Sequence, residues 1–255
     1  MIQFDQVTKE YAGRVVVDGV TLTVATGELL VVVGGSGSGK TTLLKMVNRL
    51  VEPTGGRVAV DGVDVATVEP HELRRRIGYV FQKVGLFPHM SVAENIAITP
   101  RLLEWDAVRI RERVDGLLRL VELDPDLVRD RAPSQLSGGE QQRVGVARAL
   151  AAGPATLLFD EPFGALDPIT RDRLQGSLTR IHRETGFTGI FVTHDMAEAL
   201  LLGQRIAVMD RGHLVQVGPP ETLLREPASA YVTSLLDTPR QQALALTARF
   251  EGRRT

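Results

Sequence analysis

Short apolar runs that stop at glycine or at an acidic residue divide the chain into predicted strands. The run ELLVVVGG (Glu28–Gly35) is continuous and β-branched, which is typical of a parallel strand buried on both faces. ATLLFDE (Ala155–Glu161) and TGIFVTH (Thr188–His194) have the same character, and VTLTV (Val20–Val24) alternates like a half-buried strand. We also predict strands over residues 56–62 and 75–82, and a hairpin over residues 204–218 that turns at Asp210–Gly212.

Between these runs the apolar spacing changes to a helical period. KTTLLKMVNRL (Lys40–Leu50) places Leu43, Leu44, Val47 and Leu50 on one helix face. Over Ala107–Leu123 apolar residues keep the same period, and Arg and Glu fill the other face. We interpret Met90 to about Arg131 as a mostly helical insertion. Buried strands that alternate with helices predict an α/β fold with a parallel sheet.

Composition narrows the possible functions. The 255 residues suffice for one large domain, or for one domain with a subdomain. A net charge of −1 gives no support for a long nucleic-acid face, so we expect no nucleic-acid partner. The absence of cysteine excludes disulfides, thiolate metal sites and a cysteine nucleophile. The start lacks a secretory signal, and the apolar run at Leu29–Gly35 is too short to span a bilayer, so we expect a soluble chain.

A phosphate-binding loop follows the first buried strand. GGSGSGKTT matches the pattern G-x-x-x-x-G-K-[ST] between a predicted strand and a predicted helix. Glycines let the backbone fold around phosphate oxygens, and the helix start supplies positive potential. We expect Lys40 to reach the β- and γ-phosphates and Thr41 to offer its hydroxyl to Mg²⁺. The predicted nucleotide-binding residues here are Gly34, Gly35, Ser36, Gly37, Ser38, Gly39, Lys40, Thr41 and Thr42.

Three polar residues follow the ends of two other buried strands. Ligands collect at the carboxyl ends of strands in an open parallel sheet, so these residues should meet the phosphate loop. Asp160 is then placed to hold Mg²⁺ through water. Glu161 could orient or deprotonate an attacking water, and His194 could contact the γ-phosphate or position that water. The remaining histidines lack such a context and are predicted to be surface or packing residues.

A second candidate anion site is LSGGE, where Ser137, Gly138 and Gly139 stand at a predicted helix start followed by Glu140. With these pieces present, the chain resembles the ATP-binding subunits of ABC transporters from Ile2 to about Leu236. The resemblance implies a RecA-like parallel-sheet core, an N-terminal antiparallel β part and a helical subdomain at about 90–150. It also implies a head-to-tail dimer with a second copy, in which LSGGE of one chain closes over ATP held by the phosphate loop of the other.

The resemblance assigns further roles by position. Tyr11 resembles the aromatic residue that stacks on adenine, and Gln82 resembles the glutamine that reaches Mg²⁺ and senses the γ-phosphate. Residues 165–167 (Ala, Leu, Asp) match the loop that touches the partner subunit. Glu140 stands where the family usually has glutamine, and we expect its side chain to point away from the nucleotide. Gly35 also departs from the usual residue, which the motif tolerates.

Three stretches narrow the subfamily: residues 45–65, 78–105 and 160–175. They are similar to the quaternary-amine osmoprotectant uptake ATPases, which serve glycine betaine, choline, carnitine or proline betaine transport. The implied partners are transmembrane permease subunits and, indirectly, a substrate-binding protein, at the cytoplasmic face of the inner membrane. The alternatives are an importer for polar amino acids or another small solute, a soluble ATP-switched interaction module, and a P-loop kinase, against which LSGGE counts.

Two regions carry expectations about coupling and regulation. Val84–Val92 follows Gln82, and its apolar residues Leu86, Phe87 and Met90 are predicted to anchor the permease; subdomain packing is the alternative. Residues 237–255 are interpreted as a tail or a fraying helix. Many members of the subfamily carry paired regulatory CBS domains after the ATPase domain. We expect none here, because under twenty residues cannot form such a pair.

Overall fold

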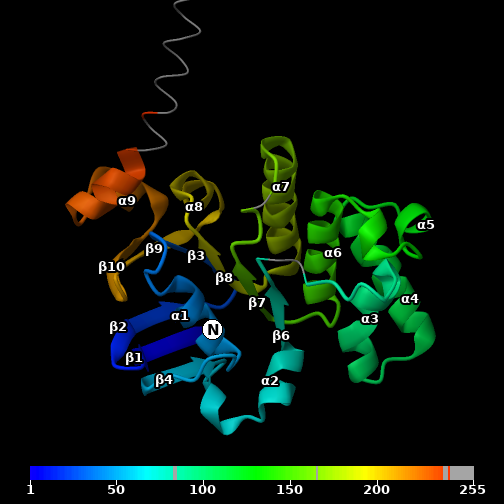
Figure 1. Ribbon diagram of the computed structural model, residues 1–255, viewed down its shortest axis with the longest axis horizontal. Helices are drawn as coiled ribbons and strands as arrows, with labels where there is room; N and C mark the ends of the chain where they lie inside the picture. Colours follow the sequence, from blue (N-terminus) through cyan, green and yellow to red (C-terminus); the bar gives the residue numbers. More distant parts are fainter. Residues whose placement is uncertain (83–84, 165, 238–240, 242–255) are drawn as a thin grey trace, which may run out of the picture.

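The computed structural model of the protein describes residues 1–82, 85–164, 166–237 and 241. Two sheets and a group of helices make up the fold (Figure 1). The larger sheet has the order β10-β9-β3-β8-β7-β6, with β10 antiparallel to β9 and the other neighbours parallel. Its strands are β3 (Leu29–Val33), β6 (Ile77–Val80), β7 (Thr156–Asp160), β8 (Thr188–Thr193), β9 (Arg205–Asp210) and β10 (His213–Gly218).

The smaller sheet is antiparallel, with the order β2-β1-β4-β5. Its strands are β1 (Ile2–Tyr11), β2 (Arg14–Val24), β4 (Gly55–Val60) and β5 (Val63–Asp64). The strand expected at Val20–Val24 is the end of β2, which begins six residues earlier, at Arg14. In β1 the alternation breaks because Gln6 has a φ of 47° and the register shifts between Phe4 and Val7.

The described helices cover both sheets and build a group of their own beside β6 (Figure 1). They are α1 (Lys40–Val47), α2 (Pro70–Arg76), α3 (Val92–Leu102), α4 (Ala107–Leu120), α5 (Pro125–Val128), α6 (Gly138–Leu150), α7 (Pro168–Thr185), α8 (Met196–Leu202) and α9 (Pro220–Arg225). Short 3₁₀ turns lie at Val65–Thr67 and Pro133–Gln135. Helices α3 to α6 form the group at the right of Figure 1.

Strand β3 shows why the core has two halves. Successive side chains of a strand point to opposite faces. Leu29, Val31 and Val33 pack into the apolar cluster that includes α3, α4 and α6. Leu30 and Val32 pack into a second cluster with α1 and the antiparallel sheet. The parallel sheet is therefore the middle layer, which explains why its strands read as unbroken apolar runs.

Two element boundaries differ from the sequence prediction. The first helix ends at Val47, because Arg49 takes a φ of 54° and the Asn48 side chain accepts a hydrogen bond from Leu50 N. Leu50 is consequently 44% exposed instead of lying on the buried face. The strand predicted over residues 75–82 covers only Ile77–Val80, because Arg75 and Arg76 end the helix α2, which apolar spacing did not indicate.

Candidate functional site

The phosphate loop joins β3 to the start of α1. Gly39 has a φ of 99°, and a Cβ there would lie 2.5 Å from the Val16 carbonyl oxygen. A Cβ on Gly34 would collide with the Met209 carbonyl oxygen. Strands β2 and β9 therefore close in on the loop from neighbouring sheets, and only glycine fits at these two positions.

Lys40 lies inside this loop and is only 5% exposed. Its Nζ donates to the carbonyl oxygens of Gly34 and Gly35, both at 2.8 Å, and contacts Ser38 Oγ at 3.4 Å. Burial lowers the pKa of the Lys40 ammonium, while the nearby carboxylates of Glu161 and Asp160 oppose that shift. The ammonium is thus held as a fixed positive charge at the centre of the loop.

A residue far along the sequence also contacts the loop. Gly35 N donates to the hydroxyl of Tyr231 at 2.7 Å. Tyr231 belongs to the helical segment at residues 230–237, and its ring packs partly against the main apolar cluster. Sequence reasoning missed this contact, because nothing in the local pattern around Tyr231 indicates a partner 196 residues away.

Asp160 is the hub of a hydrogen-bonded carboxylate site at the end of β7. Thr41 Oγ1 donates to Asp160 Oδ1 at 2.8 Å, and the Tyr79 hydroxyl donates to Oδ2 at 3.0 Å. Burial, with help from the Asp160 charge, raises the pKa of Tyr79, so the phenol stays a donor. A carboxylate beside a threonine hydroxyl is a set of hard oxygen donors that suits Mg²⁺. Tyr79 is a second residue that the sequence did not indicate.

Glu161 holds the next position and takes a left-handed backbone, with a φ of 45°. Its N–H donates to the Val192 carbonyl at 3.0 Å, which ties the turn to β8. Its Oε2 accepts from Gln82 Nε2 at 3.0 Å and lies 3.3 Å from His194 Nδ1. A non-glycine residue held in this conformation is a local strain that the surrounding strands must enforce. The strain aims the carboxylate between Gln82 and His194.

The signature segment lies at the start of α6. Ser137 Oγ donates to Glu140 Oε2 at 2.7 Å, and Ser137 N donates to the same oxygen at 2.8 Å. Glu140 N in turn bonds Ser137 Oγ at 3.3 Å, which completes a capping box. These hydrogen bonds to Ser137 lower the pKa of Glu140. The side chain folds back onto the helix start, and its orientation relative to a bound nucleotide stays a prediction.

The loop after Glu161 leads to the start of α7. Asp167 caps this helix by accepting from Ile169 N and Thr170 N, at 3.1 and 3.0 Å. These hydrogen bonds lower the pKa of Asp167. A Cβ on Gly139 would lie 2.5 Å from Thr170 Cγ2, so the signature packs directly beside this helix start. Leu166 accepts a hydrogen bond from Arg171, and Ala165 lies outside the described residues.

Tyr11 lies apart from the contacts above, at the end of β1. Its ring is 46% exposed, and the Lys9 ammonium stands 4.8 Å from the ring centre. The ring is thus exposed but carries the Lys9 ammonium over one face, and its stacking on adenine stays a prediction. Its neighbour strand β2 passes the phosphate loop at Val16.

The predicted docking stretch borders a groove of about 460 Å³ that Gly85 and Phe87 help to line. Phe87 is 44% exposed, whereas Leu86 and Met90 are half-buried and Leu86 packs against the main core. Of the three predicted anchors, Phe87 alone is therefore well exposed, and the anchoring role stays a prediction. Val84 and the C-terminal tail, apart from Asp237 and Gln241, lie outside the described residues.

A phosphate loop, a strand-end carboxylate pair and a separate capped helix start define a nucleotide-binding cassette on a parallel sheet. The chain belongs to the ABC transporter family, whose model matches residues 17–164. None of the helices in the described ranges is both long and apolar enough to cross a membrane.

Relatives agree with the resemblance found in the sequence. The glycine betaine/carnitine/choline transport ATP-binding protein OpuCA of Bacillus subtilis is 49% identical over 237 residues, which cover 92% of this chain and 62% of OpuCA. The glycine betaine uptake system ATP-binding protein YehX of Escherichia coli is 51% identical over 232 residues, covering 91% of this chain and 75% of YehX. The chain thus spans about three fifths of the length of OpuCA.

The fold has a solved counterpart. The dimeric, post-hydrolysis structure of the ATP-binding cassette MJ0796, bound to ADP and Pi, superposes with a TM-score of 0.78 at 33% identity. It covers 86% of this chain and 99% of the other. The predicted fold class, a parallel-sheet core with an antiparallel part, is confirmed.

Proposed function

We propose that this chain is the ATP-hydrolysing subunit of a membrane importer for quaternary-amine osmoprotectants such as glycine betaine or choline. The observation that carries the proposal is the convergence of five residues at one edge of the sheet: Lys40, Thr41, Gln82, Asp160 and Glu161. Thr41 is hydrogen-bonded to Asp160 and Gln82 to Glu161, and the charges of both carboxylates act on the Lys40 ammonium. The names of OpuCA and YehX support the quaternary-amine class.

Each residue at this edge has a task that fits its surroundings. Loop N–H groups and Lys40 bind the phosphates of ATP, while Thr41, Asp160 and Gln82 hold Mg²⁺. The metal ion would neutralise charge on the phosphate oxygens. Glu161 accepts a proton from the attacking water, because its Oε1 has no hydrogen bond among the described residues. His194, 3.3 Å from Oε2, orients this carboxylate.

Two copies act together in this proposal. Ser137, Gly138 and Gly139 of one chain close over the γ-phosphate held by the phosphate loop of the other, and Leu166 and Asp167 line the contact. The dimeric MJ0796 structure supports this arrangement. Closure passes to transmembrane permease subunits at the groove beside Phe87, and a substrate-binding protein delivers the solute. The chain then sits peripherally at the cytoplasmic face of the inner membrane.

ATP hydrolysis by the purified chain in membrane vesicles tests the proposal. Wild type is compared with Glu161→Gln, with and without the permease and a betaine-type binding protein. We expect Glu161→Gln to lower turnover by about 10²–10³-fold, as for loss of a general base, and to trap an ATP-bound dimer. The matched control is Glu184→Gln, an exposed change in α7 that should behave like wild type.

Repeating the assay with different solutes distinguishes the alternative functions. Stimulation of wild type by glycine betaine or choline supports the quaternary-amine importer. Stimulation by a polar amino acid instead would keep the importer and replace the solute. ATP-dependent dimerisation without any response to a permease would favour the soluble interaction module. Normal turnover in Glu161→Gln would refute the role of Glu161.

A further inference from the structure

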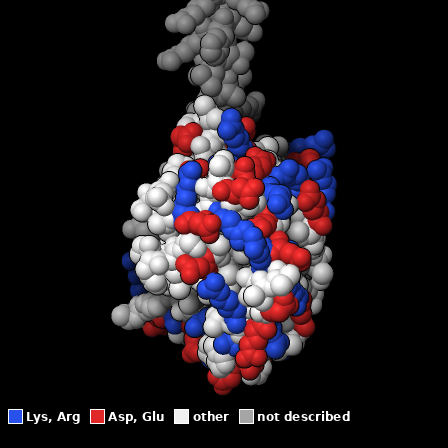
Figure 2. Space-filling view, turned by 90° about the vertical axis from the view of Figure 1, so that its right-hand side faces the viewer, with Lys and Arg blue, Asp and Glu red and all other residues white. Residues whose placement is uncertain are grey.

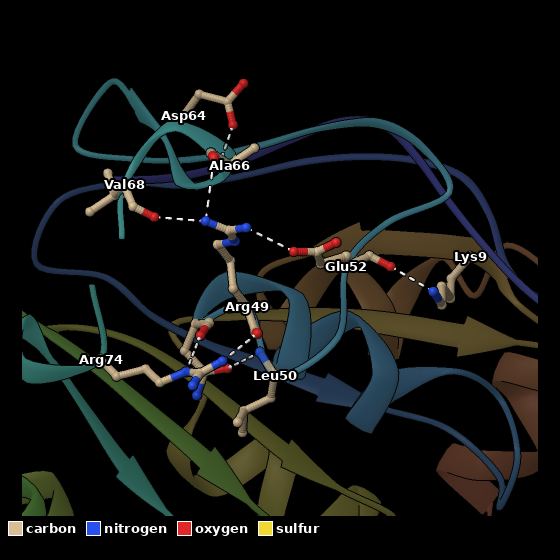
Figure 3. A network of polar contacts seen from close by, with 9 residues as sticks. Lys9, Arg49, Leu50, Glu52, Asp64, Ala66, Val68 and Arg74 are labelled. Atoms are coloured by element: carbon tan, nitrogen blue, oxygen red, sulfur yellow. Dashed lines mark hydrogen bonds and ion pairs between the residues drawn. The ribbon is translucent and has the colours of Figure 1, made fainter. Parts of the chain in front are cut away.

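Charged side chains are arranged differently in two parts of the molecule. Over the outer face of the helical group, acidic and basic side chains are interspersed (Figure 2). Around the end of α1, Lys9, Arg49, Glu52 and Arg74 belong to one network of polar contacts (Figure 3). Arg49 donates to Glu52 Oε1 at 2.8 Å and to the Val68 carbonyl at 2.7 Å. Arg74 donates to the Arg49 carbonyl at 2.7 Å, so these contacts fix the turn that follows α1.

Lys9 joins this network to the aromatic ring at the end of β1. Its Nζ donates to the Glu52 carbonyl at 2.7 Å (Figure 3) and stands 4.8 Å from the centre of the Tyr11 ring. Thr54 holds the same turn against β1, because its N–H and its hydroxyl donate to the Thr8 carbonyl at 2.8 and 3.1 Å. The half-buried Lys9 ammonium therefore has a fixed place, from which it attracts one face of the ring.

The Tyr11 ring is close to the phosphate loop through the strand that pairs with its own. Tyr11 lies opposite Arg14 in the hairpin of β1 and β2. Two residues further along β2, the Val16 carbonyl lies beside Gly39 of the loop. A nucleotide whose phosphates occupy the loop can thus bring its base to the ring, and stacking needs only an exposed aromatic face. Because Lys9 stands over one face, the opposite face is the one left for the base.

We propose that Lys9 is a positioning residue for the nucleotide, which holds the Tyr11 ring so that the face away from its ammonium receives the base of ATP. The inference rests on the proposed function, because ATP must occupy the phosphate loop for a base to reach this ring. A ring that is already ordered loses less freedom when the base binds, so Lys9 raises the affinity without touching the nucleotide. This effect requires a base, and a ligand made of phosphates alone does not benefit from it.

The test compares the affinity of the full chain for ATP with its affinity for inorganic triphosphate, both measured by isothermal titration calorimetry with Mg²⁺. We expect Lys9→Met to weaken ATP binding about two- to tenfold, the range for ordering one side chain, and to leave triphosphate binding unchanged. Lys9→Arg should keep most of the affinity for ATP, because a guanidinium also binds the face of an aromatic ring. Arg111→Met removes one positive charge from an exposed position of α4 and should bind both ligands as wild type does.

Tyr11→Ala completes a double-mutant cycle, and melting temperatures show whether each variant is folded. In the Tyr11→Ala background Lys9→Met should have no further effect on ATP affinity, since Lys9 then has no ring to hold. Equal losses for ATP and triphosphate would mean that Lys9 acts by charge on the phosphates, and would overturn the inference. So would wild-type ATP affinity in Lys9→Met, or an undiminished effect of Lys9→Met without the ring; both leave the proposed function intact. Failure of the wild-type chain to bind ATP would instead overturn the proposed function and this inference with it.

Discussion

The chain carries two helix starts suited to phosphate, and they are built in opposite ways. At α1 the loop is enclosed by Val16 and Met209, and Lys40 is buried within it. At α6 Ser137 and Gly138 are exposed, and a Cβ on Gly138 would meet no atom within 4 Å. The first start is a preorganised site that its own chain completes.

The second start is instead satisfied locally by a side chain of its own helix. Glu140 accepts from both Ser137 N and Ser137 Oγ, so the capping groups already have a partner. Among the described residues, no hydrogen bond or ion pair joins this segment to the phosphate loop. The difference is compatible with the proposed function, in which the first start binds ATP within one chain and the second closes over ATP held by another chain.

The largest difference between the two helix starts is expected when one glycine of each is replaced by alanine. Gly39→Ala would force a Cβ into the left-handed region and against Val16, at a cost of about 2–5 kcal/mol. We expect a lower melting temperature and at least a tenfold loss of nucleotide affinity, measured with a fluorescent ATP analogue. Gly138→Ala is the matched control, and its monomer should bind nucleotide as the wild-type monomer does. Equal affinity in both variants would contradict the preorganised loop.

The next largest effect is expected from the hydrogen bond between Tyr231 and the phosphate loop. Tyr231→Phe leaves the Gly35 N–H without its acceptor, which should cost about 0.5–1.5 kcal/mol in unfolding free energy. Urea denaturation measures the loss, and nucleotide titration shows whether the loop still binds. Tyr11→Phe removes a hydroxyl but keeps the exposed ring, so it should change neither quantity. If Tyr231→Phe changed neither the unfolding free energy nor nucleotide binding, the hydroxyl contact would not fix the loop.

Removing the negative charge at the second start should strengthen the pairing of two chains. Glu140→Gln keeps an oxygen that can accept from Ser137 N, but it no longer cancels the positive end of α6. We expect ATP-dependent dimerisation to tighten about two- to fivefold, the range of a charge at a helix terminus. Analytical ultracentrifugation in the Glu161→Gln background measures it.

Helix α3 supplies the control for this change, because Ser91 and Glu94 form the same capping box there. Glu94→Gln should lower the free energy of unfolding about as much as Glu140→Gln does. It should leave dimerisation unchanged. Tightening in both variants would point to a general effect of net charge, and weaker dimerisation in Glu140→Gln would show that the carboxylate assists closure.

The sequence predicted those parts of the site that depend on local spacing. The phosphate loop is one continuous motif, and Asp160, Glu161 and His194 each end a buried strand, so a parallel sheet brings them to one edge. Contacts from Tyr79 and Tyr231 could not be predicted, because each depends on tertiary packing around a single aromatic residue. Helix α2 was missed for a related reason: only Leu73 among its residues is buried, so it lacks an apolar stripe.

The smallest expected effect is on the pH dependence of the unfolding free energy. It distinguishes the capping role of Glu140 from the effect of its charge on dimerisation. Hydrogen bonds from Ser137 hold the pKa of Glu140 below its ordinary value of 4.5. Because the folded pKa is lower than the unfolded one, the carboxylate stabilises the protein above about pH 4.5, and that contribution is lost as the pH falls through the folded value.

Wild type should therefore exceed Glu140→Gln in unfolding free energy at pH 7 by at most about 1 kcal/mol, the size of a capping interaction. The margin should shrink as the pH falls below 4.5, because only the wild type has a carboxylate to protonate there. Urea titrations at both pH values measure the margin, and Glu94→Gln should follow the same trend, since Ser91 lowers the pKa of Glu94 in the same way. A margin independent of pH would mean that the carboxylate does not cap α6 in solution, and the second helix start would then need another explanation for its stability.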